Sequence, residues 1–396
     1  MTRSFTEIRK RFLSGLALAA LAFSLPLMGQ EGQGDVTVTK GVARLIPIAL
    51  SGFTGETQEV LQFDLYVAGF SLVSPGQGEW DLVSQAGGEL EAVLNNVTAK
   101  TEAFHRSYPG GSVRSRAHTL ADEVVEAVTG RKGIAKYKIA FKLDLGRSSE
   151  VAVCDYDGGG MVQLTHDGNT VAAPNWGAGR RSLFYTSYKS GYPDIYSHDL
   201  GSGARQPFAN FPGLNTSASV SPDGSKVAMI LSKSGSPDLW VANADGSGLR
   251  QLTTTREDES SPCWSPDGST ICFASRESGI PLLYTIPASG GSMRRLSTGG
   301  VGNVSEPDWS PDGKLIAFTH MKKGDNFEIC VMPASGGNVD VLAAGEDASW
   351  APNSRTLIFV RKDHYVPHLS LLDVPTKRVK DVVRMTGNCS QPSWSR

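Results

Sequence analysis

This sequence of 396 residues has no large excess of charge of either sign, few cysteines and none of the common catalytic motifs. Its 38 lysines and arginines nearly balance its 40 aspartates and glutamates. The resulting net charge of −2 gives no reason to expect nucleic acid or an anionic membrane as a partner. The five cysteines are too few, and odd in number, for a disulfide framework. We expect them to be small buried side chains, with a bridge between Cys263 and Cys272 as the alternative.

Motifs of the common catalytic sites are missing as well. The chain has no Gly-x-Ser-x-Gly nucleophile elbow, no phosphate-binding Gly-x-x-x-x-Gly-Lys-Ser/Thr loop and no His-Glu-x-x-His metal motif. His364 and His368 lie four residues apart, but on a predicted strand or hairpin, where that spacing does not pair two ligands as it does on a helix. We therefore predict no catalytic residue, no cofactor and no metal site.

The longest apolar run lies at the N-terminus. Basic side chains between Arg3 and Arg11 precede an apolar core at residues 16–23, Pro26 ends it, and small residues follow near Gly29. This order is typical of a secretory signal peptide, which we place at residues 1–29. The alternative is a transmembrane anchor, for which the run is short. No later stretch is apolar enough for a membrane helix, so we expect a secreted protein that does not span a membrane.

A repeat of about 44 residues organises the C-terminal two-thirds of the chain. The recurring anchors are separated by 44, 44, 45, 41 and 44 residues and lie at Trp176, Val220, Trp264, Trp309, Trp350 and Trp394. Each repeat reads as four short strands, which is typical of a β-propeller blade. Asp223, Asp267 and Asp312 recur in Ser-Pro-Asp-Gly turns, so we assign them a structural role.

Six anchors predict six blades. The last repeat contributes little more than Trp394 before the chain ends at Arg396, so its remaining strands must come from elsewhere. We expect them at residues 138–141, 151–154 and 161–164, just before the first anchor. Such closure removes the exposed edges of an open array.

The region before the propeller does not show the repeat. Strand-like runs occur at residues 36–38, 43–50, 80–83 and 90–108, and apolar residues recur at helical spacing in 57–68 and 115–129. The sequence therefore predicts a small α/β N-terminal domain at residues 35–135, followed by an all-β six-bladed β-propeller at residues 136–396.

In this order, these features resemble the TolB family of the Tol–Pal envelope system. The resemblance is carried by Val-Thr-Val-Thr-Lys-Gly at residues 36–41, by the first helix and Gly-Phe at 60–70, by His118 to Gly133, and by the blade motifs up to Pro-Ser-Trp-Ser at 392–395. It covers residues 35–396. The blade motif alone is unspecific, whereas the junction between helix and propeller is specific.

The resemblance implies a monomeric, non-enzymatic scaffold of the periplasm. Its propeller would bind the peptidoglycan-associated lipoprotein Pal, and its N-terminal strand would bind the inner-membrane protein TolA, with other outer-membrane proteins as further candidates. The role implied is support of outer-membrane integrity and of constriction at cell division. The TolA-binding strand would be Asp35, Val36, Thr37, Val38 and Thr39.

The loops before the innermost strands converge on one mouth of a propeller, where binding surfaces commonly lie. In the family, loops of the second and third blades face the lipoprotein, which corresponds here to Leu214, Ser217 and Ser260. The whole predicted Pal-binding face is Leu214, Asn215, Ser217, Asp258, Ser260, Glu306 and Asp347. Nearby acidic residues favour a basic patch on the partner; they are Glu257, Asp258, Glu259, Glu306, Glu346 and Asp347.

The alternative function is a propeller enzyme, such as a metal-dependent lyase or a lactone hydrolase. Such an enzyme needs His, Asp, Glu or Asn converging from several blades at equivalent inner positions. Most residues expected there are small and neutral, which favours a binding surface; the pairs begin at Ala172, Ser217, Ser261, Glu306, Ala348 and Gln391.

Overall fold

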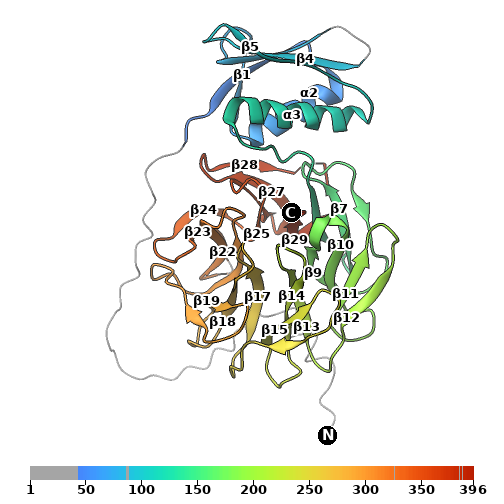
Figure 1. Cartoon of the computed structure of the whole chain (residues 1–396), viewed down its shortest axis with the longest axis vertical. Helices are drawn as coiled ribbons and strands as arrows, with labels where there is room; N and C mark the ends of the chain where they lie inside the picture. The colour runs from blue at the N-terminus through green and yellow to red at the C-terminus, as the bar shows by residue number, and fades with distance from the viewer. Residues whose placement is uncertain (1–42, 86–88, 325, 383, 386) are drawn as a thin grey trace. The chain divides into compact units, whose positions relative to one another are not determined.

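The computed structural model describes residues 43–85, 89–324, 326–382, 384–385 and 387–396. All of them belong to one compact unit, Asp35–Arg396, whose helices and strands are drawn in Figure 1. The predicted signal peptide (1–29) and the predicted TolA-binding strand (35–39) lie outside the described residues. Within the described ranges, no helix combines the length and the apolar character that crossing a bilayer requires.

A five-stranded mixed sheet and two helices precede the propeller. The strand order is β2-β1-β3-β4-β5; β1 pairs in parallel with β2 and β3, and the other pairs are antiparallel. The elements are β1 Ile46–Ser51, α2 Gly55–Val67, β2 Phe70–Val73, β3 Trp80–Ser84, β4 Leu90–Asn96, β5 Thr101–Tyr108 and α3 Val113–Thr129.

Both helices cover the same side of this sheet (Figure 1). Leu61 of α2 and Leu120 of α3 belong to one buried core with Leu82 and Leu94 of the sheet. Helix α3 begins two residues before the predicted start because the Ser112 side chain caps it, accepting a hydrogen bond from the Ser115 N–H at 3.1 Å. The helix ends at Gly130, whose φ of 68° is left-handed.

The described part of the chain after residue 137 forms six four-stranded sheets, as predicted. The first blade contains β9 Val171–Trp176, β10 Ser182–Ser187, β11 Asp194–Asp199 and β12 Arg205–Ala209. The second contains β13 Asn215–Val220, β14 Lys226–Leu231, β15 Asp238–Asn243 and β16 Arg250–Gln251. The third contains β17 Glu259–Trp264, β18 Thr270–Ser275, β19 Leu282–Pro287 and β20 Arg294–Arg295.

The fourth blade contains β21 Val304–Trp309, β22 Leu315–Lys322, β23 Asn326–Pro333 and β24 Asp340–Ala344. The fifth contains β25 Glu346–Trp350, β26 Thr356–Asp363, β27 Val366–Asp373 and β28 Arg378–Asp381. The sixth contains β29 Asn388–Trp394, β6 Lys138–Asp144, β7 Ser149–Asp155 and β8 Val162–Gln163. A single 3-10 turn, Ala178–Arg180, follows β9.

The sixth blade joins the two ends of the propeller, as predicted. Trp394 of β29 pairs with Ile139 of β6, so the last strand of the chain and the first strand of the propeller share one sheet. The Ser395 N–H donates to the Lys138 carbonyl at 2.9 Å, and the Lys138 N–H donates to the Ser395 hydroxyl at 2.8 Å. The Arg396 guanidinium then donates to the Trp350 carbonyl of the fifth blade at 3.0 Å. The ring is thus closed by the last residues of the chain.

The recurring tryptophans tie neighbouring blades together. The indole N–H of Trp176 donates to the Ser393 carbonyl at 3.0 Å, that of Trp264 to Ser219 at 2.9 Å, and that of Trp350 to Asp308 at 3.1 Å. Each acceptor belongs to the preceding blade. Three of the five anchor tryptophans therefore supply a hydrogen bond between blades besides their apolar surface, whereas Trp309 donates to the Gly313 carbonyl of its own blade at 3.3 Å.

The repeated aspartates serve their own turns, as predicted. Asp223 accepts hydrogen bonds from the Ser221 hydroxyl at 2.6 Å and the Ser225 N–H at 3.0 Å, and Asp267 and Asp312 are bonded in the same way. These donors lower the pKa of Asp223 and of Asp267 to about 2. The five cysteines are all buried and free; Cys263 faces Cys272 across β17 and β18 without a bridge.

Candidate functional site

A ring of six bulges lines the central channel. The innermost strand of each blade shifts register once, and at each shift one residue has a positive φ between 50° and 58°; these residues are Ala173, Ser217, Ser261, Glu306, Asp347 and Gln391. Non-glycine residues rarely adopt this conformation, so its recurrence marks a feature of the fold. All six line a cavity of about 460 Å³ in the channel.

Half of this ring is held by side chains that reach the next blade. Glu306 accepts a hydrogen bond from the Asp347 N–H at 3.1 Å, and Asp347 accepts one from the Gln391 N–H at 3.3 Å. Gln391 in turn accepts one from the Ala173 N–H at 2.9 Å. In the other half, Ala173, Ser217 and Ser261 have side chains too short for this contact. The expectation of small, neutral residues therefore holds for half of the channel.

One carboxyl oxygen of Glu306 and one of Asp347 accept hydrogen bonds within the wall. The Thr319 hydroxyl also donates to Glu306, at 2.7 Å. Burial raises the pKa of Glu306; burial first, and then the charge of Glu306, raise the pKa of Asp347. Oε2 of Glu306 and Oδ2 of Asp347 accept these bonds, and among the described residues the two carboxyl groups belong to no set of three or more side chains close enough to hold a metal ion.

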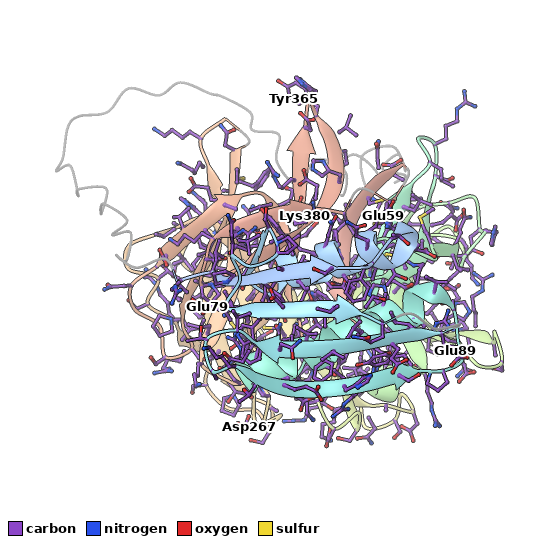
Figure 2. All side chains as sticks on the ribbon, turned by 90° about the horizontal axis from the view of Figure 1, so that it is seen from above. Glu59, Glu79, Glu89, Asp267, Tyr365 and Lys380 are labelled. Atoms are coloured by element: carbon purple, nitrogen blue, oxygen red, sulfur yellow. The ribbon has the colours of Figure 1, made fainter. Side chains whose placement is uncertain are left out.

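The predicted docking loops lie on the face that also carries a hairpin turn from every blade. The Ser232 N–H donates to the Leu214 carbonyl at 2.9 Å, and the Arg276 N–H donates to the Asp258 carbonyl at 3.3 Å. We call these loops, together with the turns that join the second and third strands of each blade, the hairpin face. The Ser-Pro-Asp-Gly turns and the turns between third and fourth strands form the Asp-Gly face. Figure 2 shows Tyr365 of the hairpin face and Asp267 of the Asp-Gly face at opposite edges of the view.

The residues predicted to bind Pal have different environments on the hairpin face. Asp258 and Ser260 are exposed, and Leu214 and Ser217 are half-buried. Asn215 is fully buried: its amide donates to the carbonyls of Pro193 and Phe211 at 3.1 and 2.8 Å. Asn215 therefore holds the loop in place, while Asp258 and Ser260 face solvent.

The hairpin face carries less exposed negative charge than its number of acidic residues indicates. Glu346 is paired with Lys362 at 2.8 Å. Glu259 is buried and accepts hydrogen bonds from the hydroxyls of Thr253, Thr255 and Ser275 at 3.0, 2.7 and 3.0 Å. Burial raises the pKa of Glu259 from 4.5 to about 7. Exposed carboxylate charge comes instead from the neighbouring Glu257 and Asp258.

Glu259→Gln is expected to stabilise the protein above neutral pH. Between pH 4.5 and about 7 the folded protein keeps a proton on Glu259 that the unfolded chain loses. Wild-type stability therefore falls as pH rises through this window, by on the order of 2 kcal/mol, and glutamine removes that loss. The three hydroxyls can reverse direction to meet the glutamine amide. Urea denaturation from pH 4 to 8 measures the effect, with the exposed Asp258→Asn as matched control. A stability difference between Glu259→Gln and wild type that stays constant with pH would contradict it.

A second polar cluster joins the helices of the N-terminal region to the sixth blade. The Arg114 guanidinium of α3 donates to both oxygens of Asp157, at 2.5 and 2.6 Å, in the turn after β7. His118 of α3 pairs with Asp64 of α2 at 2.8 Å, and the Tyr156 hydroxyl donates to Asp64 at 2.5 Å. Apart from Arg114, these side chains are almost completely buried.

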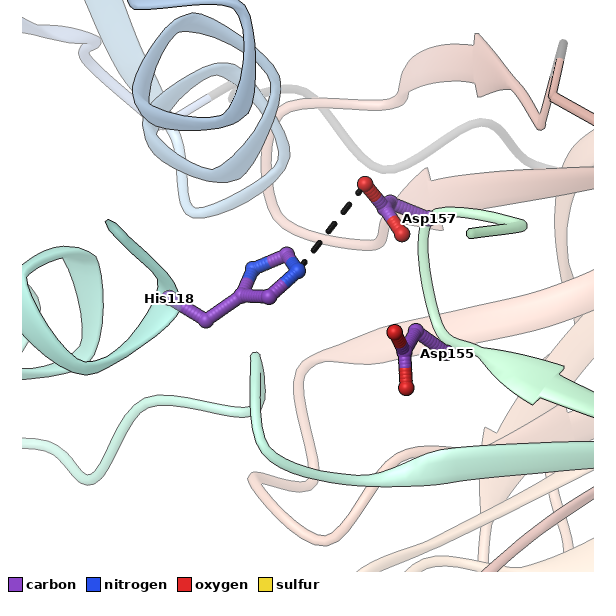
Figure 3. A group of neighbouring side chains, drawn as sticks. All are labelled: His118, Asp155 and Asp157. Carbon is purple, nitrogen blue, oxygen red and sulfur yellow. Dashed lines mark ion pairs between the residues drawn. The ribbon is translucent and has the colours of Figure 1, made fainter. Parts of the chain in front are cut away.

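Two members of the cluster, His118 and Asp157, lie close enough to the neighbouring Asp155 to hold a metal ion with it. Ligand atoms of the three side chains lie within 4.8 Å of one another. Nε2 of His118 is 4.0 Å from Oδ2 of Asp157, and Figure 3 shows the two side chains facing each other. The positive charge beside Asp157 is already supplied by Arg114. The pKa of His118 is raised: burial opposes its charge, but the hydrogen bond to Asp64 and the charges of Asp64 and Asp157 outweigh burial. The cluster is thus an internal ion-pair network.

The Asp-Tyr-Asp-Gly sequence at residues 155–158 predicts a tight turn in a blade, with contact to a cation as the alternative. The structure confirms the turn and adds the contact with α3. Two signals were present: Tyr156 is a large apolar side chain at a turn, and His118 lies between the apolar Ala117 and Leu120 on the buried side of α3. Neither signal indicates which distant residue is the partner.

The fold and the channel define a class of protein: a six-bladed propeller built from repeats with Ser-Pro-Asp-Gly turns. Residues 125–396 match the model of the family described as the TolB beta propeller domain. The chain belongs to this family, as the sequence predicted.

Relatives and solved structures agree with this assignment. Tol-Pal system protein TolB of Anaeromyxobacter dehalogenans is 32% identical over 285 residues, which cover 60% of this chain and 64% of the relative. The corresponding protein of Francisella tularensis is 29% identical over 175 residues, covering 42% of this chain and 40% of the relative. The matched region thus spans less than two thirds of these relatives. The fold is similar to that of TolB from Acinetobacter baumannii, with a TM-score of 0.80 at 21% identity, over 91% of this chain and 99% of that one.

Proposed function

We propose that this protein is a periplasmic component of a Tol–Pal system that acts by binding other proteins and catalyses no reaction. Membership of the TolB propeller family and the names of its relatives support the proposal. In this role it would support outer-membrane integrity and constriction at cell division. The organisation would be a signal peptide at 1–29, an N-terminal domain at 35–135 and the propeller at 136–396, acting as a monomer, with residues 35–39 binding TolA.

The hairpin face would bind the Pal lipoprotein. The observation that carries this proposal is that the loops before the second and third blades lie on the hairpin face, where Asp258 and Ser260 are exposed just before Ser261 of the ring of bulges. Glu306 and Asp347 of the channel wall accept hydrogen bonds from backbone N–H groups and the Thr319 hydroxyl, and among the described residues they belong to no set of three or more side chains close enough to hold a metal ion, which favours a protein-binding surface over a metal-dependent enzyme. Exposed loops on a rigid scaffold suit such a role.

Replacing both Ser217 and Ser260 with arginine is expected to weaken Pal binding by about a hundredfold or more. Each arginine would place a bulky, unpaired charge in the contact. Calorimetry with the Pal domain of the same organism measures affinity, and circular dichroism checks folding. Ser335→Arg is the matched control, because Ser335 is exposed on the Asp-Gly face. Wild-type affinity in a folded double variant would remove the hairpin face from consideration.

A further inference from the structure

One position in the propeller holds the loop that precedes its blade. Asn215 is the first residue of β13 and Glu259 is the first residue of β17, and each lies two residues before the bulge of its blade. The Asn215 N–H donates to the Pro193 carbonyl at 3.1 Å. The Glu259 N–H makes the same contact one blade later, with the Pro237 carbonyl at 2.9 Å. Both side chains are buried, so the two residues occupy equivalent places in the second and third blades.

Asn215 holds its loop, residues 210–214, with a group that does not titrate. Its side-chain oxygen accepts the Phe211 N–H at 3.0 Å, and its amide nitrogen donates to the Phe211 carbonyl at 2.8 Å. An amide keeps its acceptor and its donors across the pH range in which proteins stay folded. The contact between Asn215 and its loop is therefore independent of pH.

Glu259 reaches the corresponding loop, residues 252–258, through the hydroxyl of Thr255. This hydroxyl lies 2.7 Å from Oε1 of Glu259 and 3.0 Å from the carbonyl oxygen of Glu257, and it has a single proton to donate. If Glu259 is protonated, its carboxyl O–H donates to the Thr255 oxygen, and Thr255 donates to the Glu257 carbonyl. If Glu259 is ionised, it accepts the Thr255 proton, and the Glu257 carbonyl loses this donor.

A second buried carboxyl group opposes the ionisation of Glu259. The Thr253 hydroxyl lies between the two groups, 3.0 Å from Oε2 of Glu259 and 3.4 Å from Oδ1 of Asp238. Oδ2 of Asp238 also accepts a hydrogen bond from the Gln251 amide at 2.9 Å, and this amide nitrogen can only donate. The hydroxyls around Glu259 can both donate and accept, so a proton is accommodated on Glu259.

Other charged groups near Glu259 are bonded elsewhere or exposed. Beside it, β18 contributes the Ser275 hydroxyl, 3.0 Å from Oε1. On β21, the carboxyl groups of Glu306 and Asp308 accept hydrogen bonds from the fourth and fifth blades. The charged side chains of the loop and of the adjacent hairpin turns are exposed; they are Lys233, Arg256, Glu257, Asp258, Arg276 and Glu277. Burial therefore raises the pKa of Glu259 first, and the charge of Asp238 adds to that rise.

We propose that Glu259 is a pH-sensitive switch for the loop of residues 252–258, which its protonated form holds through Thr255 and which its ionised form releases. The pKa of Glu259 is raised to about 7, so the loop is held below that pH and released above it. The loop carries the exposed Glu257 and Asp258, so the switch changes the mobility of the hairpin face whichever partner binds there. The bond from the Arg276 N–H to the Asp258 carbonyl does not involve Glu259 and keeps the release local.

Hydrogen exchange followed by mass spectrometry on the full protein tests the switch. Amides at both ends of the loop are hydrogen-bonded: the Leu252 N–H donates to the Leu239 carbonyl at 2.8 Å, and the Glu259 N–H donates to Pro237. After correction for the intrinsic pH dependence of exchange, peptides covering residues 252–259 should exchange about fivefold faster at pH 8.5 than at pH 5.5, as expected for the loss of one hydrogen bond. Peptides covering residues 210–215 are the internal control and should not change.

Three variants assign the effect to the proposed groups. Glu259→Gln replaces the carboxyl O–H with an amide donor and should keep the loop protected at both pH values. Thr255→Val removes the hydroxyl that connects Glu259 to Glu257 and should exchange at the fast rate at both. Asp258→Asn neutralises the neighbouring exposed acid and should keep the wild-type rise. Circular dichroism checks folding, and Thr255→Val keeps the test decisive should Glu259→Gln fail to fold.

A rise in exchange confined to residues 252–259, in the wild type and in Asp258→Asn, is the expected result. The same rise in the control peptides would show a general loss of stability and would overturn the switch. A rise that persisted in Glu259→Gln or in Thr255→Val would overturn it as well. Loss of the rise in Asp258→Asn would assign it to the exposed acid and remove the role of Glu259.

Discussion

Trp394→Ala is expected to lower the free energy of unfolding by about 3–5 kcal/mol. Trp394 is 2% exposed, and its strand joins the end of the propeller to its beginning by pairing with Ile139. The substitution leaves a cavity at the one blade that both ends of the propeller build. Deletion of residues 391–396 should act more strongly still, because it also removes the backbone bonds between Ser395 and Lys138 and opens the ring.

Tyr365→Ala provides the control for Trp394→Ala. It also truncates an aromatic side chain, but one that is 97% exposed, so its effect on stability should stay within about 0.5 kcal/mol. Urea denaturation and differential scanning calorimetry measure both variants and the deletion. A deletion variant with an unchanged melting profile would contradict closure of the ring by the last strand.

Arg114→Ala is expected to destabilise the junction between α3 and the sixth blade by about 3–5 kcal/mol. Asp157 is 1% exposed, and Arg114 donates to both of its oxygens. Without the guanidinium, a buried carboxylate loses its counter-charge. Asp157→Asn in the same background removes that charge and should recover much of the loss, so a double-mutant cycle should give a coupling energy of about 2 kcal/mol or more.

Lys138→Met tests the specificity of this effect. Lys138 pairs at 2.7 Å with Asp155, the last residue of β7, but the Lys138 side chain is 52% exposed. An exposed pair of this kind contributes about 1 kcal/mol at most. The measurement is urea denaturation followed by both tryptophan fluorescence and circular dichroism, because the two parts of the chain need not unfold together. An Arg114→Ala variant as stable as Lys138→Met would show that the junction does not depend on the ion pair.

The architecture could be predicted from the sequence because it depends on local chemistry. Ser-Pro-Asp-Gly turns and anchor tryptophans act over a few residues, and their spacing near 44 repeats along the chain, so the blades and their number follow without knowledge of distant contacts. The closure of Trp394 onto residues 139–141 followed for the same reason, since counting strands left one blade incomplete. Helix α3 was read from its apolar spacing and its terminal Gly130.

Most features of the candidate site could not be read in this way. Leu214, Ser217 and Ser260 were named through the resemblance to the family, but nothing in the sequence separates Asn215, which is buried, from Ser260, which is exposed. The sequence alone would make Glu259 an exposed acid beside Asp258. In the structure its carboxyl group accepts hydrogen bonds from three hydroxyls, and burial raises its pKa to about 7. Alternation along a strand decides which neighbour is buried, and a bulge shifts that alternation.

The sequence by itself determined the repeat, the six blades, the structural role of Asp223, Asp267 and Asp312, and the family, because each depends on short-range turn chemistry and regular spacing. Only the tertiary structure decided which side chains meet. Arg114 and Asp157 are 43 residues apart, and Tyr156 and Asp64 are 92 apart. It also decided that the turns between second and third strands share one face, because a propeller brings equivalent turns of successive blades to the same side while the chain separates them by a whole blade.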